Sequence, residues 1–444
     1  MGVYSKEDII RIVREEEIEF VRLQFTDIFG MLKNVAITAS QIEKAVSNQC
    51  MFDGSSIEGF VRIDESDQYL YPDLKSFRVF PWRPSHGKVA RLICDVYNTD
   101  GTPFVGDPRY VLKRVIQKAN DMGYDRFNVG PEAEFFLFKT DEEGKPTTQT
   151  NDEAGYFDLG PLDHGESTRR EICMALEQMD FEIEASHHEC AQGQHEIDFK
   201  YAEALHAADN IMTFKLAVKT LAQRNGLHAT FMPKPIFGIA GSGMHTNMSL
   251  FRNGKNAFYD PDDPRGLSKE AYSFIAGLLH HVRGMAAVTN PLVNSYKRLV
   301  PGYEAPCYLA WSASNRSALI RIPAARGQST RVELRSPDPA CNPYLELALC
   351  LAAGLDGIEK GLTPPPEVTE NIFDMNAAAR KAHGIDSLPD SLEEAIHALE
   401  ADPLVLDTLG EHVAANYIEG KRKEWEEYRT RVSSWEREKY IINY

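Results

Sequence analysis

Apolar and polar side chains alternate along several short segments in the first hundred residues. In FVRLQFTD (20–27) every second residue is apolar, which predicts a strand with one buried face. KNVAIT (33–38) and VARLICDVYN (89–98) have similar strand-like patterns. We therefore expect residues 1–106 to form a small, sheet-rich domain.

Apolar residues recur at helical spacing elsewhere, behind clear capping residues. Asp107 and Pro108 begin GDPRYVLKRVIQKANDMGY, and we place a domain boundary immediately before this helix. Residues 107–444 then form a second, larger domain, and its many strands without a regular crossover helix favour the α+β class. Further helices are predicted for DIIRIVREEE behind a Ser5–Asp8 capping box, HAADNIMTFKLAVKTLAQRNG, PYLELALCLAAGLDGIEKG, LEEAIHALEAD behind Ser391 and Glu394, and the charged RKEWEEYRTRVSSWEREKY.

Composition narrows the class of protein. The 444 residues are 43% hydrophobic and 26% charged, as in a globular protein. A net charge of −18 disfavours direct nucleic-acid binding but permits a local anion site. Seven scattered cysteines without a CxxC pair favour reduced thiols in the cytoplasm over a disulfide framework. We expect no membrane association, because the longest apolar run (347–355) is too short to span a bilayer.

Two glutamates interrupt the apolar segment GPEAEFFLFK (130–139). In one continuous strand, Glu132 and Glu134 share a face with Phe136 and Phe138, where two like charges repel. A bound divalent cation stabilises such an arrangement, since hard cations prefer carboxylate oxygens. The alternative is a pair of exposed glutamates at the end of a strand.

A predicted hairpin and a glycine-rich loop add metal-ligating side chains. HHECAQGQHEIDF brings Glu189 and Glu196 together across a tight turn, although a polar hairpin tip explains the same pattern. GIAGSGMHTNMSLF places His245 on a strand and lacks the spacing of a P-loop or a dinucleotide fingerprint. Taken alone, His245 also suits a core position.

A stretch rich in arginine follows. Arg331, Glu333 and Arg335 share one strand face in RVELR, which predicts either a solvated, charge-alternating face or an anion site. Three more arginines lie nearby in the sequence, namely Arg298, Arg316 and Arg321. Acids, a histidine and several arginines together indicate two metal ions beside phosphates, the requirements of in-line phosphoryl transfer.

Seven segments then carry a family resemblance. They are MFDGSSIEGF, GPEAEFFLF, HHECAQGQHEID, GSGMHTNMS, SYKRLVPGYEAP, NRSALIRIP and RVELRSPDPACNPYL. Over essentially its full length the chain resembles bacterial type I glutamine synthetase. Phe373 in NIFDM stands where the adenylylated subtype carries tyrosine, so the chain resembles the non-adenylylated alpha subtype.

The resemblance implies a fold and a reaction. The expected fold is a small β-grasp-like N-terminal domain and a larger catalytic domain with an open antiparallel β-barrel flanked by helices. The expected reaction joins ammonia to L-glutamate with ATP as co-substrate, giving L-glutamine, ADP and phosphate through γ-glutamyl phosphate. Two or more Mg²⁺ or Mn²⁺ ions per site are implied, one held by Glu134, Glu189 and Glu196 and the other by Glu132, His245 and Glu333.

The remaining roles also come from the resemblance. Asp53 deprotonates ammonium, Glu304 shields the acyl phosphate, and Arg316 faces the transferred phosphoryl group. Arg62 resembles an arginine tied to feedback inhibition by glutamine. Substrate binding is implied for Arg298, Arg335, Gly241, His245 and Asn247, and nucleotide binding for Tyr201, Ser249, Arg316, Arg321 and Arg331.

Some features depart from the family or leave alternatives open. Ala240, Asn247 and Gln328 stand where other members carry Asn, His and Lys, which affects the expected substrate contacts. A γ-glutamyl ligase for amines and a non-catalytic nucleotide sensor are the alternatives; the Asp53 loop argues against the first and the full set of metal ligands against the second. The implied assembly is a dodecamer of two hexameric rings with active sites between subunits. A nitrogen-responsive transcriptional regulator is a compatible further partner.

Overall fold

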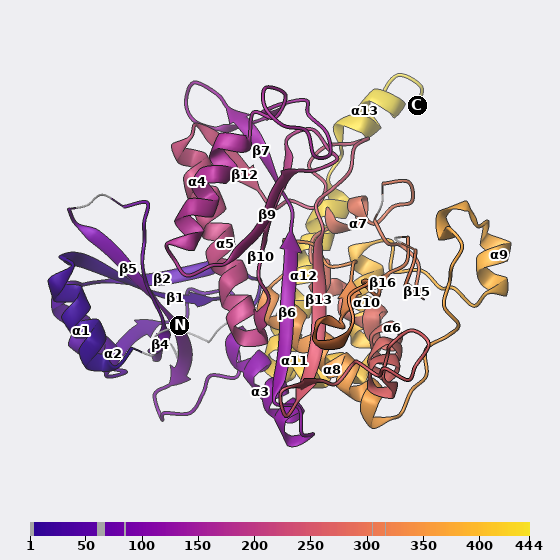
Figure 1. The fold of residues 1–444 in the computed structure, drawn as a ribbon. Helices are drawn as coiled ribbons and strands as arrows, with labels where there is room; N and C mark the ends of the chain where they lie inside the picture. The colour runs from indigo at the N-terminus through magenta and orange to yellow at the C-terminus, as the bar shows by residue number, and fades with distance from the viewer. Residues whose placement is uncertain (1–3, 60–66, 84–85, 304, 316) are drawn as a thin grey trace.

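The computed structural model describes residues 4–59, 67–83, 86–303, 305–315 and 317–444. Figure 1 shows a small N-terminal sheet domain in indigo and violet beside a larger body that contains the rest of the chain. Both parts combine strands and helices, which confirms the predicted α+β class.

The N-terminal domain is built on one five-stranded sheet with the order β2-β1-β5-β4-β3. Strands β1 and β5 are parallel and the other neighbours are antiparallel. The three strands predicted in this part of the chain are confirmed. The bounds are β1 (Ile18–Thr26), β2 (Leu32–Thr38), β3 (Cys50–Asp53), β4 (Asp67–Val79) and β5 (Lys88–Asn98).

Short helices cover one side of this sheet. In α1 (Lys6–Glu15), the Ser5 side chain accepts from the Asp8 amide while the Asp8 side chain accepts from the Ser5 amide, which confirms the predicted capping box. The helix buries its apolar face in the core of the domain. The 3-10 turn η1 (Ala39–Gln41) and α2 (Ile42–Val46) complete the cover.

Two further sheets form the framework of the larger domain. One has five strands in the order β12-β7-β10-β9 with β8 beside β7, and the other has seven in the order β11-β6-β13-β17-β16-β15 with β14 beside β13. Strand β6 also packs against β10, so the two sheets make a nearly closed, barrel-like surface. The bounds are β6 (Arg126–Ala133), β7 (Phe135–Thr140), β8 (Pro146–Thr150), β9 (Ile183–His188), β10 (Gln194–Phe199), β11 (Ala202–Glu203), β12 (Leu227–Thr230), β13 (Met244–Arg252), β14 (Lys255–Asn256), β15 (Trp311–Ser312), β16 (Ile320–Arg321) and β17 (Val332–Leu334).

Helices surround the sheets and continue to the C-terminus. The predicted cap Asp107 accepts from the Arg109 amide. Among the described residues, every helix falls short of the length and apolarity needed to cross a bilayer. The bounds are α3 (Pro108–Asp121), α4 (Glu166–Glu177), α5 (Ala204–Arg224), α6 (Lys269–Thr289), α7 (Ser295–Arg298), η3 (Gly327–Ser329), α8 (Pro343–Glu359), η4 (Ile372–Asp374), α9 (Ala377–Ala382), α10 (Leu392–Glu400), α11 (Pro403–Leu409), α12 (Glu411–Thr430) and α13 (Ser434–Tyr440).

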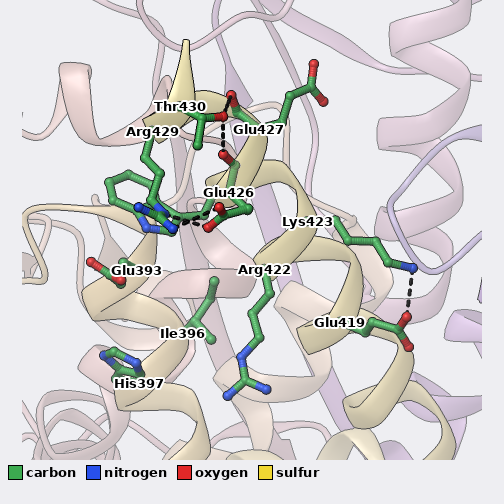
Figure 2. Close-up of a pocket in the computed structure, with 11 residues that line it drawn as sticks. Glu393, Ile396, His397, Glu419, Arg422, Lys423, Glu426, Glu427, Arg429 and Thr430 are labelled. Carbon is green, nitrogen blue, oxygen red and sulfur yellow. Dashed lines mark hydrogen bonds and ion pairs between the residues drawn. The ribbon is translucent and has the colours of Figure 1, made fainter.

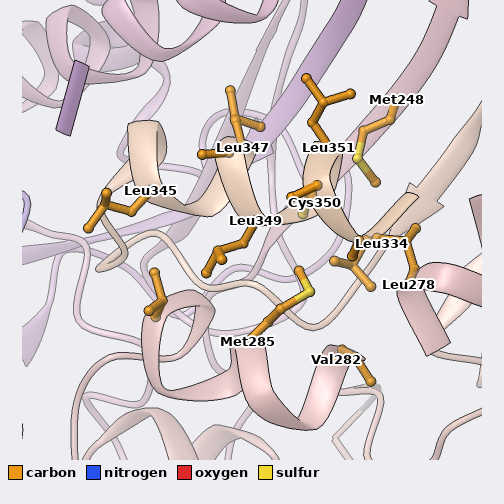
Figure 3. Close-up of a cluster of buried hydrophobic side chains, with 14 of the residues drawn as sticks. Met248, Leu278, Val282, Met285, Leu334, Leu345, Leu347, Leu349, Cys350 and Leu351 are labelled. Carbon is orange, nitrogen blue, oxygen red and sulfur yellow. The ribbon is translucent and has the colours of Figure 1, made fainter. Parts of the chain in front are cut away.

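The largest core lies between α6, α8 and the seven-stranded sheet. Figure 3 shows leucines of α8 beside Leu278 and Met285 of α6, with Met248 of β13 and Leu334 of β17 close by. Each fully buried side chain of this size contributes about 1.5–3 kcal/mol. The packing therefore fixes the inner side of β13 and β17, two strands whose other side chains include predicted metal ligands.

The prediction of one continuous strand through FNVGPEAEFFLF is wrong, because the chain changes sheets at Glu134. Strand β6 ends at Ala133 and pairs with β13, whereas β7 begins at Phe135 and pairs with β10 and β12. The Glu134 amide still donates to the Gly243 carbonyl at 3.1 Å, as the last bond of the β6–β13 ladder. Alternation along one strand therefore does not relate Glu132 to Glu134.

The prediction of a single helix over RKEWEEYRTRVSSWEREKY is also wrong. Helix α12 ends at Thr430 and Arg431 adopts an extended conformation (φ −80°, ψ 134°). Ser433 and Glu436 then form a capping box that begins α13. Serine side chains that bond to nearby amides compete with helix continuation, which explains the break.

Candidate active site

The first candidate metal cluster lies across three neighbouring strands. Glu132 on β6 is the cross-strand partner of His245 on β13, and Glu333 lies on the next strand, β17. His245 Nδ1 is 3.4 Å from Glu132 Oε2 and 3.7 Å from Glu333 Oε1. All three offer ligand atoms within 4.8 Å of one another. We call these three residues the strand cluster, and they are the set that the resemblance assigned to one ion.

The second candidate cluster surrounds the β9–β10 hairpin. His187 Nδ1 is 3.4 Å from Glu189 Oε1, and His187 Nε2 is 3.3 Å from Glu196 Oε1 and 3.9 Å from Asp198 Oδ2. The predicted pairing of the two strands is confirmed, with His187 opposite Glu196. We call Glu134, Glu189, Glu196 and Asp198, together with His187, the hairpin cluster.

Glu134 joins this cluster from the point where the chain changes sheets. Its Oε2 accepts from Gln194 Nε2 at 2.7 Å and from the Gly243 amide at 2.9 Å. Burial, followed by the charges of Glu196 and Glu189, raises the pKa of Glu134 to about 8. The hydrogen bonds hold the carboxyl group in place while the neighbouring charges disfavour its ionisation.

The two clusters differ in their electrostatic balance. Burial opposes the ionisation of Glu132, but the hydrogen bond and charge of His245 outweigh it, so the pKa of Glu132 is lowered. Burial and the charges of Asp198 and Glu189 raise the pKa of Glu196 instead. Burial and the charge of Glu132 raise the pKa of Asp198 to about 6. Carboxylates crowded in this way suit a hard divalent cation, which removes their mutual repulsion.

The glycine-rich loop packs closely on Arg298. This arginine is 3% exposed, and its guanidinium donates to the carbonyls of Ser336 and Arg335. A Cβ atom at Gly241 would lie 2.3 Å from the Pro233 carbonyl, and one at Gly243 would lie 2.5 Å from Arg298 Nη2. Any side chain at either glycine would therefore displace the loop or the arginine.

Three predicted arginines lie around the strand cluster. Arg321 Nη1 bonds to Glu333 Oε2 at 2.8 Å, and Arg335 Nη1 is 3.8 Å from Glu333 Oε1. Arg335 Nε is buried and has no hydrogen-bond partner within the part of the chain that the structure describes. Arg331 Nε donates to Asn247 Oδ1 at 2.9 Å, and Asn247 Nδ2 donates in turn to Glu132.

A cavity of about 390 Å³ opens beside both clusters. Glu132 of the strand cluster and Asp198 of the hairpin cluster both line it. Three residues predicted to bind nucleotide also line it, namely Tyr201, Ser249 and Arg331, together with Gln328 and the predicted substrate contact Asn247. The cavity therefore connects the metal-ligating side chains with the predicted nucleotide site.

A larger hollow, of about 860 Å³, lies elsewhere, between α10 and α12. Figure 2 shows its charged lining, with Lys423 paired to Glu419 and Arg429 paired to Glu426. None of the predicted site residues lines it. Although it is larger, this hollow is therefore not the candidate active site.

Not every predicted residue lies in this region. Asp53 is at the end of β3 in the N-terminal domain, where its carboxylate accepts from the amide and hydroxyl of Ser55. The hydroxyl bond, then the amide bond, lowers the pKa of Asp53. The predicted residues Arg62, Glu304 and Arg316 lie outside the described residues.

The sequence assigned no role in the site to His187, Gln194 or Asp198. Asp198 lies two residues after Glu196 on one strand. Residues two apart on a strand share a face, so this alternation would have predicted Asp198 beside Glu196. His187 pairs with Glu196 across the hairpin, which the predicted turn already implied. The bond from Gln194 to Glu134 joins residues 60 apart in sequence and carried no local signal.

Comparison with known proteins identifies the family. The domain described as "Glutamine synthetase, catalytic domain" matches residues 105–440, and "Glutamine synthetase, beta-Grasp domain" matches residues 17–99. Two curated relatives are glutamine synthetases from Clostridium saccharobutylicum, 66% identical over all of both chains, and from Staphylococcus aureus, 59% identical over 99% of each.

Solved structures agree with these matches. A complex of GmaS with ADP has a TM-score of 0.89 at 36% identity, and covers 98% of this chain and 99% of that one. The cryoEM structure of Plasmodium falciparum glutamine synthetase has a TM-score of 0.88 at 26% identity, with 99% of each chain covered.

An ATP-dependent ligase is the class that this fold and its paired acidic clusters define. The chain belongs to the glutamine synthetase family. It catalyses the ATP-dependent synthesis of glutamine from glutamate and ammonia. Members of the family are oligomeric and use divalent metal ions.

Proposed function

We propose that glutamine synthesis proceeds through γ-glutamyl phosphate in the space between the strand cluster and the hairpin cluster. The observation that supports this most directly is the shared cavity, which Glu132 lines from one cluster and Asp198 from the other. A nucleotide bound here would have room for its phosphates beside both sets of carboxylates. In-line phosphoryl transfer requires this proximity.

The donor chemistry of both clusters fits divalent cations. Glu134, Glu189 and Glu196 would hold one Mg²⁺ or Mn²⁺ ion, and Glu132, His245 and Glu333 would hold the other. When bound, these cations neutralise phosphate charge and polarise the transferred phosphoryl group. The crowding of Glu134 with Glu189 and Glu196 supports the first assignment. The carboxylate and imidazole atoms collected within 4.8 Å support the second.

Arginines and the glycine-rich loop would orient glutamate. Arg298 is proposed to bind the substrate, with the loop at Gly241 packed on its side chain. Arg335 is proposed to act near the phosphoryl group, and its buried, unpartnered Nε leaves a donor for an anionic oxygen. His245 and Asn247, beside Glu132, are proposed to complete the substrate contacts.

The nucleotide would occupy the 390 Å³ cavity. Tyr201 and Ser249, which line it, are proposed for the adenosine end, and Arg331 for the phosphates. Arg321, paired with Glu333, is proposed to lie near the nucleotide as well. Arg316 is proposed to face the transferred phosphoryl group.

Ammonium would be deprotonated by Asp53, since only neutral ammonia attacks the acyl phosphate. Asp53 is ionised at neutral pH, as an ordinary aspartate is, and the bonds from Ser55 lower its pKa further. Glu304 is proposed to shield the acyl phosphate from water. The proposed assembly is a dodecamer of two six-membered rings, in which the N-terminal domain that carries Asp53 completes the active site of a neighbour.

Four proposals extend beyond the site. We place the domain boundary between residues 106 and 107, near the limits of the two family matches. Arg62 is proposed to mediate feedback inhibition by glutamine, and a nitrogen-responsive transcriptional regulator is a proposed partner. Seven free cysteines support a cytoplasmic location, because disulfides are rare there. The metal ion proposed for the site is Mg²⁺ or Mn²⁺.

Phosphate release with ATP and Mg²⁺ tests the reaction, with glutamate and ammonium each omitted in turn. We expect rapid release only when both are present. Release that is faster with methylamine than with ammonium would contradict glutamine synthesis and favour an amine ligase. ATP binding without turnover under any of these conditions would favour a nucleotide sensor.

Mixed oligomers test the shared site. Asp53→Ala and Glu134→Ala homomers are each expected to be nearly inactive. In rings of randomly mixed subunits, about a quarter of sites combine an intact N-terminal domain with an intact catalytic domain. Doubly tagged mixed oligomers should recover about that fraction of biosynthetic activity. Recovery no greater than that of either homomer would contradict the role given to Asp53.

A further inference from the structure

A buried polar network lies behind the hairpin cluster and has no part in the predicted site. Asp152, His188 and His195 are at most 5% exposed, and their ligand atoms lie within 4.8 Å of one another. The two histidines are opposite each other on β9 and β10. Each immediately precedes a glutamate of the hairpin cluster, so the two sets of side chains come from the same strands.

Hydrogen bonds fix the protonation state of His188. Its Nδ1 lies 2.7 Å from the Glu189 carbonyl, which can only accept, so Nδ1 carries a proton. Its Nε2 lies 2.9 Å from Asp152 Oδ1, which also accepts from the Gly193 amide. Asp152 Oδ2 accepts from the His164 amide. Asp152 is therefore a carboxylate surrounded by donors, and His188 donates from both ring nitrogens.

His195 is held in the opposite state by an arginine. Arg169 Nη1 donates to His195 Nδ1 at 2.8 Å, so that nitrogen accepts and the ring is neutral. Asp163 binds the same guanidinium through two bonds, of 2.7 and 3.1 Å. Gly165 lies against the ring, where a Cβ atom would be 2.3 Å from His195 Cε1. Charge and packing together leave His195 one orientation.

The same three ligand atoms meet the geometric requirement of a metal site, but their surroundings disfavour one. His188 donates from both ring nitrogens, and His195 Nδ1 is occupied by Arg169. A guanidinium and an imidazolium beside the cluster repel a cation. The hydrogen bonds instead satisfy the buried polar atoms without an ion.

The network bonds directly to the backbone of the hairpin turn. His188 donates to the carbonyl of Glu189, and Asp152 accepts from the amide of Gly193. The Glu189 amide donates to the Gln194 carbonyl, and the Gln194 side chain donates to Glu134. Bonds from Asp152 and His188 thus fix both ends of the turn that separates the proposed ligands.

We infer that Asp152 and His188 are positioning residues that hold the hairpin turn in the conformation that binds a divalent cation. This inference rests on the proposed metal role of the hairpin cluster. Groups that orient metal ligands from outside the coordination shell typically change metal affinity by about 10–100-fold. Without the His188 bond, the Glu189 backbone is free to rotate away from Glu134 and Glu196.

The test measures Mn²⁺ binding to the purified full-length protein by electron paramagnetic resonance of free Mn²⁺. Asp152→Asn and His188→Ala should weaken one of the Mn²⁺ sites, the one assigned to the hairpin cluster, by about 10–100-fold. Activity at low Mn²⁺ should fall and recover at high Mn²⁺, with the KM for glutamate nearly unchanged. His188→Asn carries an amide donor near the position of Nδ1, and should restore Mn²⁺ affinity to within a few-fold.

A matched control is available in the same chain. His281 is also a buried histidine between carboxylates, with bonds to Asp402 at 2.8 Å and Asp356 at 3.1 Å, and it lies on α6 away from both clusters. His281→Ala should lower the melting temperature as much as His188→Ala does, yet leave Mn²⁺ affinity unchanged. Equal Mn²⁺ affinities in His188→Ala and His281→Ala would overturn the inference.

Direct ligand variants separate this inference from the proposed function. Glu196→Gln should weaken Mn²⁺ binding more than His188→Ala does. If Glu196→Gln binds Mn²⁺ like the parent protein, the proposed metal site itself is wrong. If Glu196→Gln weakens binding while the Asp152 and His188 variants do not, only the positioning role is wrong. Loss of one whole Mn²⁺ equivalent in Asp152→Asn, without weaker binding of the rest, would mean that the network is itself a metal site.

Discussion

The strand cluster and the hairpin cluster contain similar side chains but are balanced differently. In the strand cluster, Glu333 bonds to Arg321 and Glu132 accepts from Asn247, so each acid has a partner from the protein. In the hairpin cluster, burial and the charges of Glu196 and Glu189 raise the pKa of Glu134, and burial and the charges of Asp198 and Glu189 raise that of Glu196. One cluster is thus stable without an ion, and the other gains stability from one.

The difference follows from how each cluster is built. Neighbouring strands of one sheet hold the strand cluster, and packing of Val332 and Leu334 into the central core fixes β17 beneath it. The hairpin cluster is collected from the end of β6, a turn and β10, which belong to different sheets. A rigid sheet needs no ion to keep its ligands together, whereas a turn relies on its hydrogen bonds and on its ion.

The largest expected effect comes from removing the acid that joins the two sheets. Glu134→Ala should reduce kcat by about 100–1,000-fold, since metal-centred charge stabilisation supplies several kcal/mol. The fold should survive, because the side chain contributes no apolar packing. Steady-state biosynthetic assays measure the loss. Glu182→Ala, which removes an exposed glutamate paired with Lys200, is the control and should keep full activity.

The two clusters should respond with opposite sign to the loss of a charge in metal-free protein. Glu196→Gln removes repulsion and should stabilise the chelator-treated protein. Glu333→Gln breaks a buried ion pair with Arg321 and should destabilise it by about 2 kcal/mol. Thermal unfolding of both variants and the parent measures the difference. A shift of the same sign in both variants would remove the electrostatic distinction between the clusters.

Local patterns in the sequence predicted the strand cluster better than the hairpin cluster. Val332 and Leu334 alternate with Glu333, so the strand and its outward acid follow from side-chain periodicity alone. His245 likewise lies on the strand predicted after the glycine-rich loop. His245 lies opposite Glu132 because two strands distant in sequence pair in that register. Periodicity does not predict such a pairing; the family resemblance placed the two residues at one metal ion.

Features that depend on tertiary contacts were not predicted. Gly130 and Pro131 lie inside β6 and not at Glu134, so they do not mark the change of sheets, and FFLF continues the apolar pattern on the far side. The bond from Gln194 to Glu134 and the network of Asp152 with His188 join segments far apart in sequence. Ser433 did mark the break between the last two helices, but the surrounding charged pattern suited one helix equally well.

Removal of metal should loosen one cluster more than the other. We expect amide hydrogen exchange in β9 and β10 to accelerate by about tenfold on chelation, equivalent to about 1.4 kcal/mol in local opening. Exchange in β13 and β17 should change little, because their ligands are held by sheet pairing and by Arg321. Mass spectrometry of peptides from each strand measures both. Equal acceleration in the two regions would show that both clusters depend on the ion.

The smallest effect should come from Asn247, which links the strand cluster to the nucleotide cavity. Its Nδ2 donates to Glu132 and its Oδ1 accepts from Arg331. Asn247→Ala removes both bonds, and water from the adjoining cavity can replace them at Glu132 and Arg331, so the net loss should be about 1 kcal/mol, as for one ordinary hydrogen bond. We therefore expect the KM for ATP to rise by about fivefold with kcat nearly unchanged.

The Asn247→Asp variant separates the two contacts of this side chain. It replaces the bond to Glu132 with repulsion and keeps the acceptor for Arg331. If the Arg331 contact sets nucleotide affinity, Asn247→Asp keeps the parent KM for ATP, and a KM as high as that of Asn247→Ala would assign the effect to Glu132 instead.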